Sequence, residues 1–196
     1  MPQANKDFWT QRYQNQQTGW DLGTVSPPLK AYFDQLDDKQ QRILIPGAGN
    51  AHEAAYLYEQ GFEGVHVLDI ARLPLDGFAE RLPDFPREQL IEGDFFAHEG
   101  EYDLIIEQTF FCTFSPSPAN REAYARKVAS LLKAGGKVVG VWFDFPLSES
   151  GPPFGGSREE YLPYFTPYFE VQQLERAHNS HPARQGIELF GIMRRL

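Results

Sequence analysis

Two glycines and two carboxylates stand where a nucleoside can be bound. Gly47 and Gly49 follow the apolar run ILIP and precede a helix-like segment, an arrangement that brings the backbone close to a ligand. Asp69 comes about 20 residues later, where a carboxylate can accept from both ribose hydroxyls. Asp94 can accept from an adenine amine, with Phe95 against the ring. An adenosine ligand is indicated. The alternatives are a glycine turn that serves packing, and an Asp94 that caps a turn with Phe95 in the core.

The position after this turn distinguishes between adenosine ligands. The pattern G-x-G-x-x-G requires a third glycine for close packing around a pyrophosphate, and the chain has His52 there. A Gly-Lys-Ser/Thr phosphate loop is also missing. S-adenosylmethionine has no pyrophosphate and fits, with its carboxylate on the N–H groups of the turn and its ribose on Asp69. His52 itself, beside Glu53, is expected to be a surface or packing residue.

Alternating strands and helices must position these residues. The expected strands are residues 42–45, 64–68, 89–92, Tyr102–Gln108 and 136–143, followed by an antiparallel hairpin of 169–175 and 187–193. Helices are expected at 50–60, 120–132 and Arg158–Phe165, with a short, poor helix in the linker that contains Pro74, Pro83 and Pro86. Gly135 is expected to end the helix of 120–132. The order predicts a single α/β domain over residues 1–196, with a mostly parallel seven-stranded sheet and helices on both faces.

Composition limits the partners. The net charge of -9 comes from 18 Lys+Arg against 27 Asp+Glu and would repel a phosphate backbone, so no nucleic-acid partner is expected. Neither an apolar run of about 18 residues nor a secretory signal is present, which predicts a cytoplasmic protein without a membrane partner. The single cysteine, Cys112, excludes an internal disulfide and is expected in the core. No metal-ligand spacing is present, and a monomer or weak homodimer is expected.

Four stretches resemble the thiopurine methyltransferase superfamily, a branch of the class I S-adenosylmethionine-dependent methyltransferases that includes plant-type halide and thiol methyltransferases. They are FWTQRYQNQQTGWDLG, ILIPGAGNAHE with VLDIA, YDLIIEQTFFCTFSPSPANREAYARKVASLLKAGGKVV, and SGPPFGGSREEYLPYF. The resemblance runs from about Phe8 to Met193. It implies a Rossmann-like fold, S-adenosylmethionine as cofactor with S-adenosylhomocysteine as product, and methyl transfer to a small sulfur or halide nucleophile.

The resemblance also implies cofactor contacts. Trp9, Tyr13 and Trp20 reproduce an aromatic spacing W-x3-W-x6-W with one tyrosine, which implies that residues 1–40 fold over the cofactor and close the site. An aromatic face attracts a sulfonium by up to roughly 2 kcal/mol, although an N-terminal tryptophan can also fill a core gap. By the same comparison, the family's cofactor contacts fall on Gly47, Asp69, Asp94 and Phe95, with Glu107 and Gln108 facing cofactor and acceptor.

The chain departs from the family pattern at two places. Ala51 replaces a glycine of the turn and is expected to narrow it. Glu107 and Gln108 stand where thiopurine enzymes have Asp-Arg, which argues against a thiopurine-like acceptor.

In-line displacement by a thiolate, hydrosulfide, thiocyanate or halide needs positioning and desolvation rather than a strong base. The absence of a Ser/His/Asp set agrees with this. Candidate acceptor-site residues are Gln108, Phe110, Phe111, Phe143, Phe154 and Tyr161, with GPPF as a stiff lid. Arg184 matches a P-x-R-x-G-x-E pattern of plant-type relatives and either draws an anionic acceptor or pairs with Glu188. Rival hypotheses are an oxygen, nitrogen or larger aromatic thiol acceptor, a catalytically silent cofactor-binding protein, and an NAD oxidoreductase, which His52 disfavours.

Overall fold

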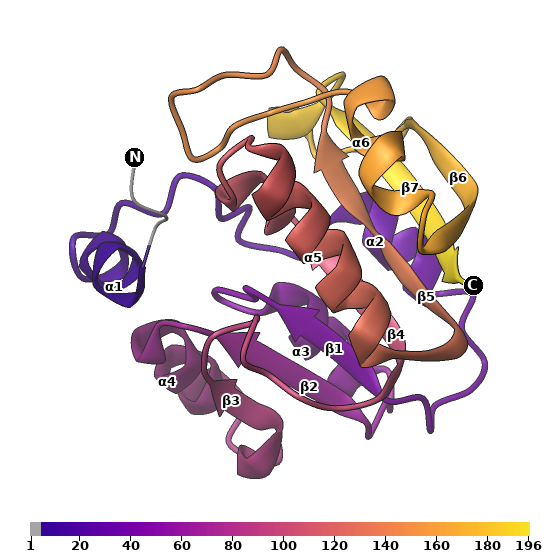
Figure 1. The fold of residues 1–196 in the computed structure, drawn as a ribbon. Coiled ribbons are helices and arrows are strands. Elements are labelled where there is room, and N and C mark those ends of the chain that lie inside the picture. Colours follow the sequence, from indigo (N-terminus) through magenta and orange to yellow (C-terminus); the bar gives the residue numbers. More distant parts are fainter. Residues whose placement is uncertain (1–4) are drawn as a thin grey trace.

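The computed structural model describes residues 5–196, which form one seven-stranded sheet flanked by helices (Figure 1). The strands are β1 (Ile43–Pro46), β2 (Val65–Asp69), β3 (Leu90–Glu92), β4 (Tyr102–Gln108), β5 (Leu132–Phe143), β6 (Phe169–Arg176) and β7 (Glu188–Arg195). The helices are α1 (Lys6–Gln14), α2 (Pro27–Phe33), α3 (His52–Glu59), α4 (Arg72–Arg81), α5 (Pro118–Leu131) and α6 (Arg158–Phe165). Short 3-10 turns are η1 (Arg87–Gln89), η2 (Phe111–Thr113) and η3 (Pro182–Arg184). Among residues 5–196, no helix is both long and apolar enough to cross a membrane.

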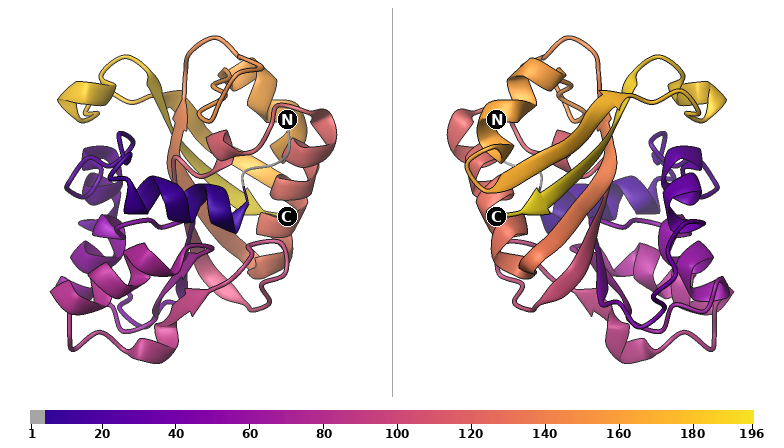
Figure 2. Two further views of the ribbon diagram at one scale, coloured as in Figure 1. Left: turned by 90° about the vertical axis from the view of Figure 1, so that its left-hand side faces the viewer. Right: turned by 90° about the vertical axis from the view of Figure 1, so that its right-hand side faces the viewer.

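The strand order is β3-β2-β1-β4-β5-β7-β6, parallel from β3 to β5 and antiparallel where β7 joins β5 and β6. This confirms the predicted fold class. Alternation along the strands separates two apolar layers. In β4, Leu104 and Ile106 join the core under α2, α3 and α4, whereas Ile105 joins the core under α5 and α6. Figure 2 shows these helices on opposite sides of the sheet.

Two local expectations are wrong. The helix before β5 does not end at Gly135, because α5 stops at Leu131 and the chain enters β5 at Leu132. Gly135 lies inside β5 with a φ of +74°, where the pairing with β4 shifts register. The proline-containing linker also forms a ten-residue helix, α4, rather than a poor one. Pro74 is in its first turn, where a missing N–H costs no hydrogen bond.

The connections define where a ligand can bind. From β1 the chain runs outward through β2 to β3, and from β4 it runs in the other direction to β5. In open parallel sheets, the crevice at such a switch point, outside the carboxyl ends of the strands, is the usual ligand site. Gly47, Asp69, Asp94, Gln108 and Phe143 all lie at or just past carboxyl ends of these strands.

Candidate active site

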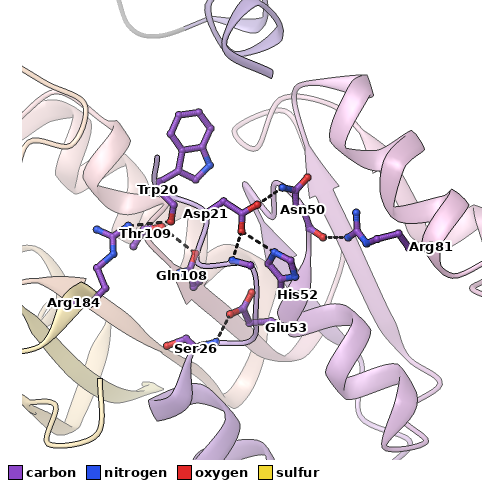
Figure 3. Close-up of polar contacts among 11 residues, drawn as sticks. Trp20, Asp21, Ser26, Asn50, His52, Glu53, Arg81, Gln108, Thr109 and Arg184 are labelled. Atoms are coloured by element: carbon purple, nitrogen blue, oxygen red, sulfur yellow. Dashed lines mark hydrogen bonds and ion pairs between the residues drawn. The ribbon is translucent and has the colours of Figure 1, made fainter. Parts of the chain in front are cut away.

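A cavity of about 560 Å³ lies at this switch point. Its walls come from the turn after β1, the ends of β2, β4 and β5, the segment after β3 and several residues between 5 and 24. Figure 3 shows polar side chains that meet around it. The volume is within the range of about 300–1,000 Å³ that is typical of small-molecule and cofactor sites.

The glycine turn needs both of its glycines. Gly47 and Gly49 have φ values of +58° and +54°. A Cβ on Gly47 would lie 2.1 Å from the ring of Phe110, and a Cβ on Gly49 would lie 2.7 Å from the hydroxyl of Tyr13. The absence of side chains therefore lets two aromatic residues of the pocket wall approach the turn closely.

Ala51, just past the turn, also has a positive φ of 56°, which non-glycine residues seldom adopt. Its methyl group is buried in the core under α2, α3 and α4 and does not line the pocket. The expectation that this methyl narrows the cofactor turn is wrong, because the side chain points into the core.

Asp69 ends β2 at the pocket wall and is almost fully buried. One carboxylate oxygen accepts from Gly49 N and the other from Ala71 N, both at 2.8 Å. Burial raises the pKa of Asp69 above its ordinary value, and these N–H groups act in the opposite direction. A carboxylate has about four acceptor positions, so each oxygen keeps capacity for one more donor, as two ribose hydroxyls require.

Asp94 and Phe95 combine the two roles that the sequence left as alternatives. The Asp94 carboxylate accepts from Phe96 N at 2.8 Å and so supports a turn, yet Asp94 also lines the pocket. Phe95 belongs to the core and lines the pocket as well. Its ring meets that of Phe110 edge-on, with centroids 5.3 Å apart. Turn capping and core packing therefore do not exclude either residue from ligand contact.

Residues 5–26, here called the strap, cover the pocket with aromatic side chains. The centroid of Trp20 lies 5.4 Å from that of Trp9 and 5.7 Å from that of Tyr13, both in edge-to-face geometry. All three line the pocket. Burial, followed by the charge of Asp69, raises the pKa of Tyr13, so its hydroxyl stays neutral. The strap thus places a set of π faces over the glycine turn.

Polar contacts at three points beside the pocket attach the strap to the rest of the protein (Figure 3), and a surface ion pair between Lys6 and Glu92 adds a fourth. Asp21 lies 2.7 Å from His52 Nε2 and accepts from Asn50, which joins the strap to the start of α3. The hydrogen bond from His52, the largest cause, holds the pKa of Asp21 well below its ordinary value. His52 is therefore an anchor of the strap, a structural role more specific than the surface or packing role expected for it.

Two further contacts of the strap lie on either side of the contact between Asp21 and His52. Glu53 accepts from Ser26 N at 2.9 Å, which holds the end of the strap against α3. Arg184 donates to the carbonyl oxygen of Trp20 at 3.0 Å, which links the strap to the segment before β7. The strap is therefore bound to both halves of the sheet across the pocket.

The other end of the pocket lies around β4 and β5. Thr109 donates to the side-chain oxygen of Gln108 at 2.9 Å, and both residues line the pocket. The guanidinium of Arg184 lies 4.7 Å from the ring centroid of Phe143. Within residues 5–196, Arg184 forms no ion pair with Glu188, whose carboxylate is buried without a hydrogen-bond partner. Of the two roles left open for Arg184, the structure therefore favours a place in the pocket wall.

The lid loop contributes to this end of the pocket through its prolines. Pro152 and Pro153 line the cavity, whereas Phe154 is buried behind them. Tyr161 also lies outside the lining, because its hydroxyl donates to the carbonyl of Phe143 at 2.6 Å within the core. The assignment of Phe154 and Tyr161 to the acceptor site is wrong.

Glu107 and Phe111 do not line the pocket either. Neighbouring side chains of a strand point to opposite faces, so Gln108 at the end of β4 faces the cavity and Glu107 faces the core. Glu107 accepts from Phe110 N and Phe111 N at 2.7 and 2.9 Å and from the Tyr124 hydroxyl. Phe111 packs against Tyr124, with ring centroids 4.9 Å apart. The assignment of Glu107 to cofactor contact and of Phe111 to the acceptor site is wrong.

The sequence patterns did not single out Asp21, Asn50 or Glu53, which the structure places at the pocket. Asp21 stands in WDLG, directly after an aromatic residue that was selected, and Asn50 and Glu53 flank the glycine turn. Their position next to these motifs was the signal by which they could have been selected as pocket residues. The pairing itself joins residues 29 and 31 positions apart, and no local pattern reports it.

The fold and this pocket define a class of protein. The structure of 1,6-didemethyltoxoflavin-N1-methyltransferase of Burkholderia thailandensis with bound S-adenosylhomocysteine superposes with a TM-score of 0.76 at 16% identity, covering 97% of this chain and 86% of that one. At that identity the likeness shows the fold alone, which is the Rossmann-like class I methyltransferase fold.

Sequence comparison identifies the family within that class. The sequence model of the thiopurine S-methyltransferase (TPMT) family matches residues 4–192, so the chain belongs to this family. A probable thiol methyltransferase 2 of Arabidopsis thaliana is 26% identical, over 97% of this chain and 86% of the relative. A thiopurine S-methyltransferase of Pseudomonas aeruginosa is 30% identical, over 87% of this chain and 86% of the relative.

Proposed function

We propose that the protein transfers the methyl group of S-adenosylmethionine to a small sulfur or halide nucleophile by in-line displacement. The observation that carries this proposal is the difference between the two ends of one pocket. Glu53, Asp69 and Asp94 lie at the end near β1, β2 and β3, beneath the aromatic strap, and the strap itself adds Asp21 and Arg12 to the lining. Arg184 lies at the other end, beside Gln108 and the Phe143 ring. A carboxylate-rich, aromatic end suits a sulfonium cofactor, and a cationic end suits an anionic acceptor.

The residues at the first end fit the cofactor. Asp69 has acceptor capacity for the ribose, and the glycine turn brings backbone close to the pocket at Gly47 and Gly49. Asp94 and Phe95 stand where an adenine can be held. S-adenosylmethionine, when bound, supplies an electrophilic methyl group on a cationic sulfur, which leaves with the bonding electron pair as S-adenosylhomocysteine.

At the second end, the protein has to orient the acceptor and exclude water. Arg184 attracts a negative charge, and Phe110, Phe143 and the two lid prolines exclude solvent. A thiolate, hydrosulfide, thiocyanate or halide brings its own electron pair, so no residue has to remove a proton in the transfer step. The strap meets the segment before β7 at this end through the bond from Arg184 to Trp20. Positioning and desolvation are thus the contributions of this chain to rate.

Calorimetry with S-adenosylhomocysteine tests the cofactor assignment, and no binding at about 1 mM would overturn it. A scan of acceptors with S-adenosylmethionine then tests the reaction. Methylated product from thiols, sulfide, thiocyanate or iodide is expected. Product from only a carboxylate, an amine or a large aromatic thiol would favour the rival hypothesis of an oxygen, nitrogen or larger aromatic thiol acceptor. Cofactor binding without consumption in the presence of all these acceptors would favour the other rival, a catalytically silent cofactor-binding protein.

A further inference from the structure

Glu107 is the second-last residue of β4, directly before the segment that lines the pocket. The side chain is fully buried, and it lies just before residues 108–114, here called the wall loop. One of its oxygens accepts from two successive backbone N–H groups, Phe110 N at 2.7 Å and Phe111 N at 2.9 Å. The other oxygen accepts from the hydroxyl of Tyr124 on α5. Its bonds therefore join the wall loop and α5 to the end of β4.

No cation neutralises this carboxylate among residues 5–196. The titratable groups that face it are Tyr124 from α5 and Cys112 from η2, and burial raises the pKa of both, so both stay neutral. From β5 it meets Gly140, where an added Cβ would lie 2.4 Å from the Glu107 Cβ. A buried carboxylate without a counter-ion is costly, and its presence here calls for a role that an apolar residue cannot fill.

The wall loop has a conformation that needs external support. Thr109 has a φ of +53°, which a β-branched residue rarely adopts. The next residue, Phe110, lays its ring against Gly47 of the glycine turn. Gln108, Thr109, Phe110, Cys112, Thr113 and Phe114 all line the pocket. The bonds of Glu107 to the two N–H groups that follow Thr109 therefore hold the acceptor side of the pocket in shape.

We propose that Glu107 is a positioning residue whose carboxylate holds the wall loop, and with it Gln108 and Phe110, in the geometry that receives the methyl acceptor. Its effect on the acceptor rests on the proposed function, and its effect on the loop does not. Burial raises the pKa of Glu107 to about 7, so this carboxylate changes its charge near neutral pH. An ionised acceptor forms hydrogen bonds roughly twice as strong as a neutral one. Opening of the wall loop alone leaves Glu107 buried on β4 and removes only the two N–H donors, which lower its pKa. Ionisation therefore opposes this local opening, although it lowers the stability of the whole fold.

Hydrogen exchange in the protein without ligands tests the effect on the loop. Glu107→Gln keeps the shape and one acceptor oxygen but cannot ionise. At about pH 8 the Phe110 and Phe111 amides should exchange about tenfold faster in this variant than in the wild type, after correction for intrinsic rates. The difference should shrink as the pH falls below about 7. Equal protection of the two proteins at the higher pH would overturn the proposal.

Tyr102→Phe is the matched control. Tyr102 begins the same strand and loses one hydroxyl contact, 2.8 Å from His98 Nε2, at the opposite edge of the sheet. Its substitution should leave the exchange of Phe110 and Phe111 unchanged. Should Glu107→Gln fail to fold by circular dichroism, Tyr124→Phe takes its place. Loss of that donor destabilises the ionised Glu107, so the pH at which protection is half lost should rise, and an unchanged midpoint would overturn the proposal.

Kinetics with thiocyanate, which does not titrate near neutrality, test the effect on the acceptor. In Glu107→Gln the acceptor KM should rise about tenfold at about pH 8, with kcat changed by less than about threefold. The wild-type kcat/KM should fall as the pH drops through about 7, whereas that of the variant should not change. A wild-type pH profile in the variant would overturn the proposal. A wild type that methylates no acceptor would count against the proposed function instead, and exchange would still decide the role of Glu107.

Discussion

The carboxylate of Asp21 lies 2.7 Å from Nε2 of His52, and this contact joins the strap to the first turn of the helix that follows the glycine turn. Asp21 is further held by Gly23 N at 2.8 Å and by the side chain of Asn50. His52, which argues against a dinucleotide ligand, therefore also holds the strap over the proposed cofactor site. A role in closing the pocket explains why an imidazole stands where a pyrophosphate-binding turn has glycine.

Asp21→Asn should loosen the strap, because the charged acceptor for His52 is lost. S-adenosylhomocysteine affinity at neutral pH is expected to fall about tenfold by calorimetry, which corresponds to about 1.4 kcal/mol. Asp38→Asn is the control, since Asp38 accepts from Gln40 N at 3.0 Å in a comparable exposed turn away from the pocket. Equal affinities of the two variants would mean that the Asp21 contact does not hold the strap closed.

The same pair has a pH signature in stability. The folded protein depresses the pKa of Asp21 below its ordinary value of 3.8. The resulting stability is present above that ordinary value and is lost as the pH falls through the lower folded value. The difference in the free energy of unfolding between wild type and Asp21→Asn, measured by urea denaturation, should therefore be constant near neutrality and shrink only in acid below 3.8. A difference that shrinks near neutrality would contradict this.

Asp69→Ala should weaken S-adenosylhomocysteine binding by roughly 1.5–3 kcal/mol, the range for hydrogen bonds to a charged group. The substitution also frees the N–H groups of Gly49 and Ala71. Asp69→Asn keeps one acceptor oxygen and should bind with intermediate affinity in the same calorimetric titration. Unchanged affinity in Asp69→Ala would show that the ribose assignment is incorrect.

Gly47→Ala should destabilise the protein, because the new methyl group would clash with a neighbouring ring and because alanine is strained at this backbone conformation. The added Cβ would lie 2.1 Å from the Phe110 ring, at a φ of +58°. Gly61→Ala is the matched control, because Gly61 has a φ of +87° and nothing within 4 Å of an added Cβ. The control should lose about 1–2 kcal/mol of stability, and Gly47→Ala should lose about 1–3 kcal/mol more from overpacking. Thermal unfolding with and without S-adenosylhomocysteine measures both, and similar losses would argue against tight packing at this turn.

Arg184→Gln should separate anionic from neutral acceptors. Without the guanidinium, the KM for thiocyanate or iodide is expected to rise about tenfold, and more than the KM for a neutral thiol. Arg126→Gln removes an equal charge from an exposed ion pair with Glu122 and serves as the control. An equal rise of KM for charged and uncharged acceptors would mean that Arg184 acts through its bond to Trp20 rather than through its charge.

Glu107 should affect stability in the direction opposite to Asp21. Its pKa rises from 4.5 to about 7 on burial, so the folded protein keeps a proton that the unfolded chain releases. This contribution to the free energy of unfolding is full below 4.5 and is lost as the pH rises through about 7. The stability of the wild type relative to Glu107→Gln should therefore fall between these values in urea denaturation. Parallel curves would contradict the buried, raised pKa.

The sequence alone determined the α/β class, the order of strands and helices from β1 onward, and the glycine turn with Asp69 at the next strand end, but it did not predict α1 and α2. These features follow from hydrophobic periodicity and from short-range geometry, which neighbouring residues report. Only the tertiary structure decided that Gln108 faces the pocket and Glu107 the core, since alternation along a strand does not say which of its two covered faces meets the pocket. It also decided that His52 meets Asp21 and that Arg184 meets Trp20. These contacts join residues 31 and 164 positions apart, and only the folded sheet brings them together.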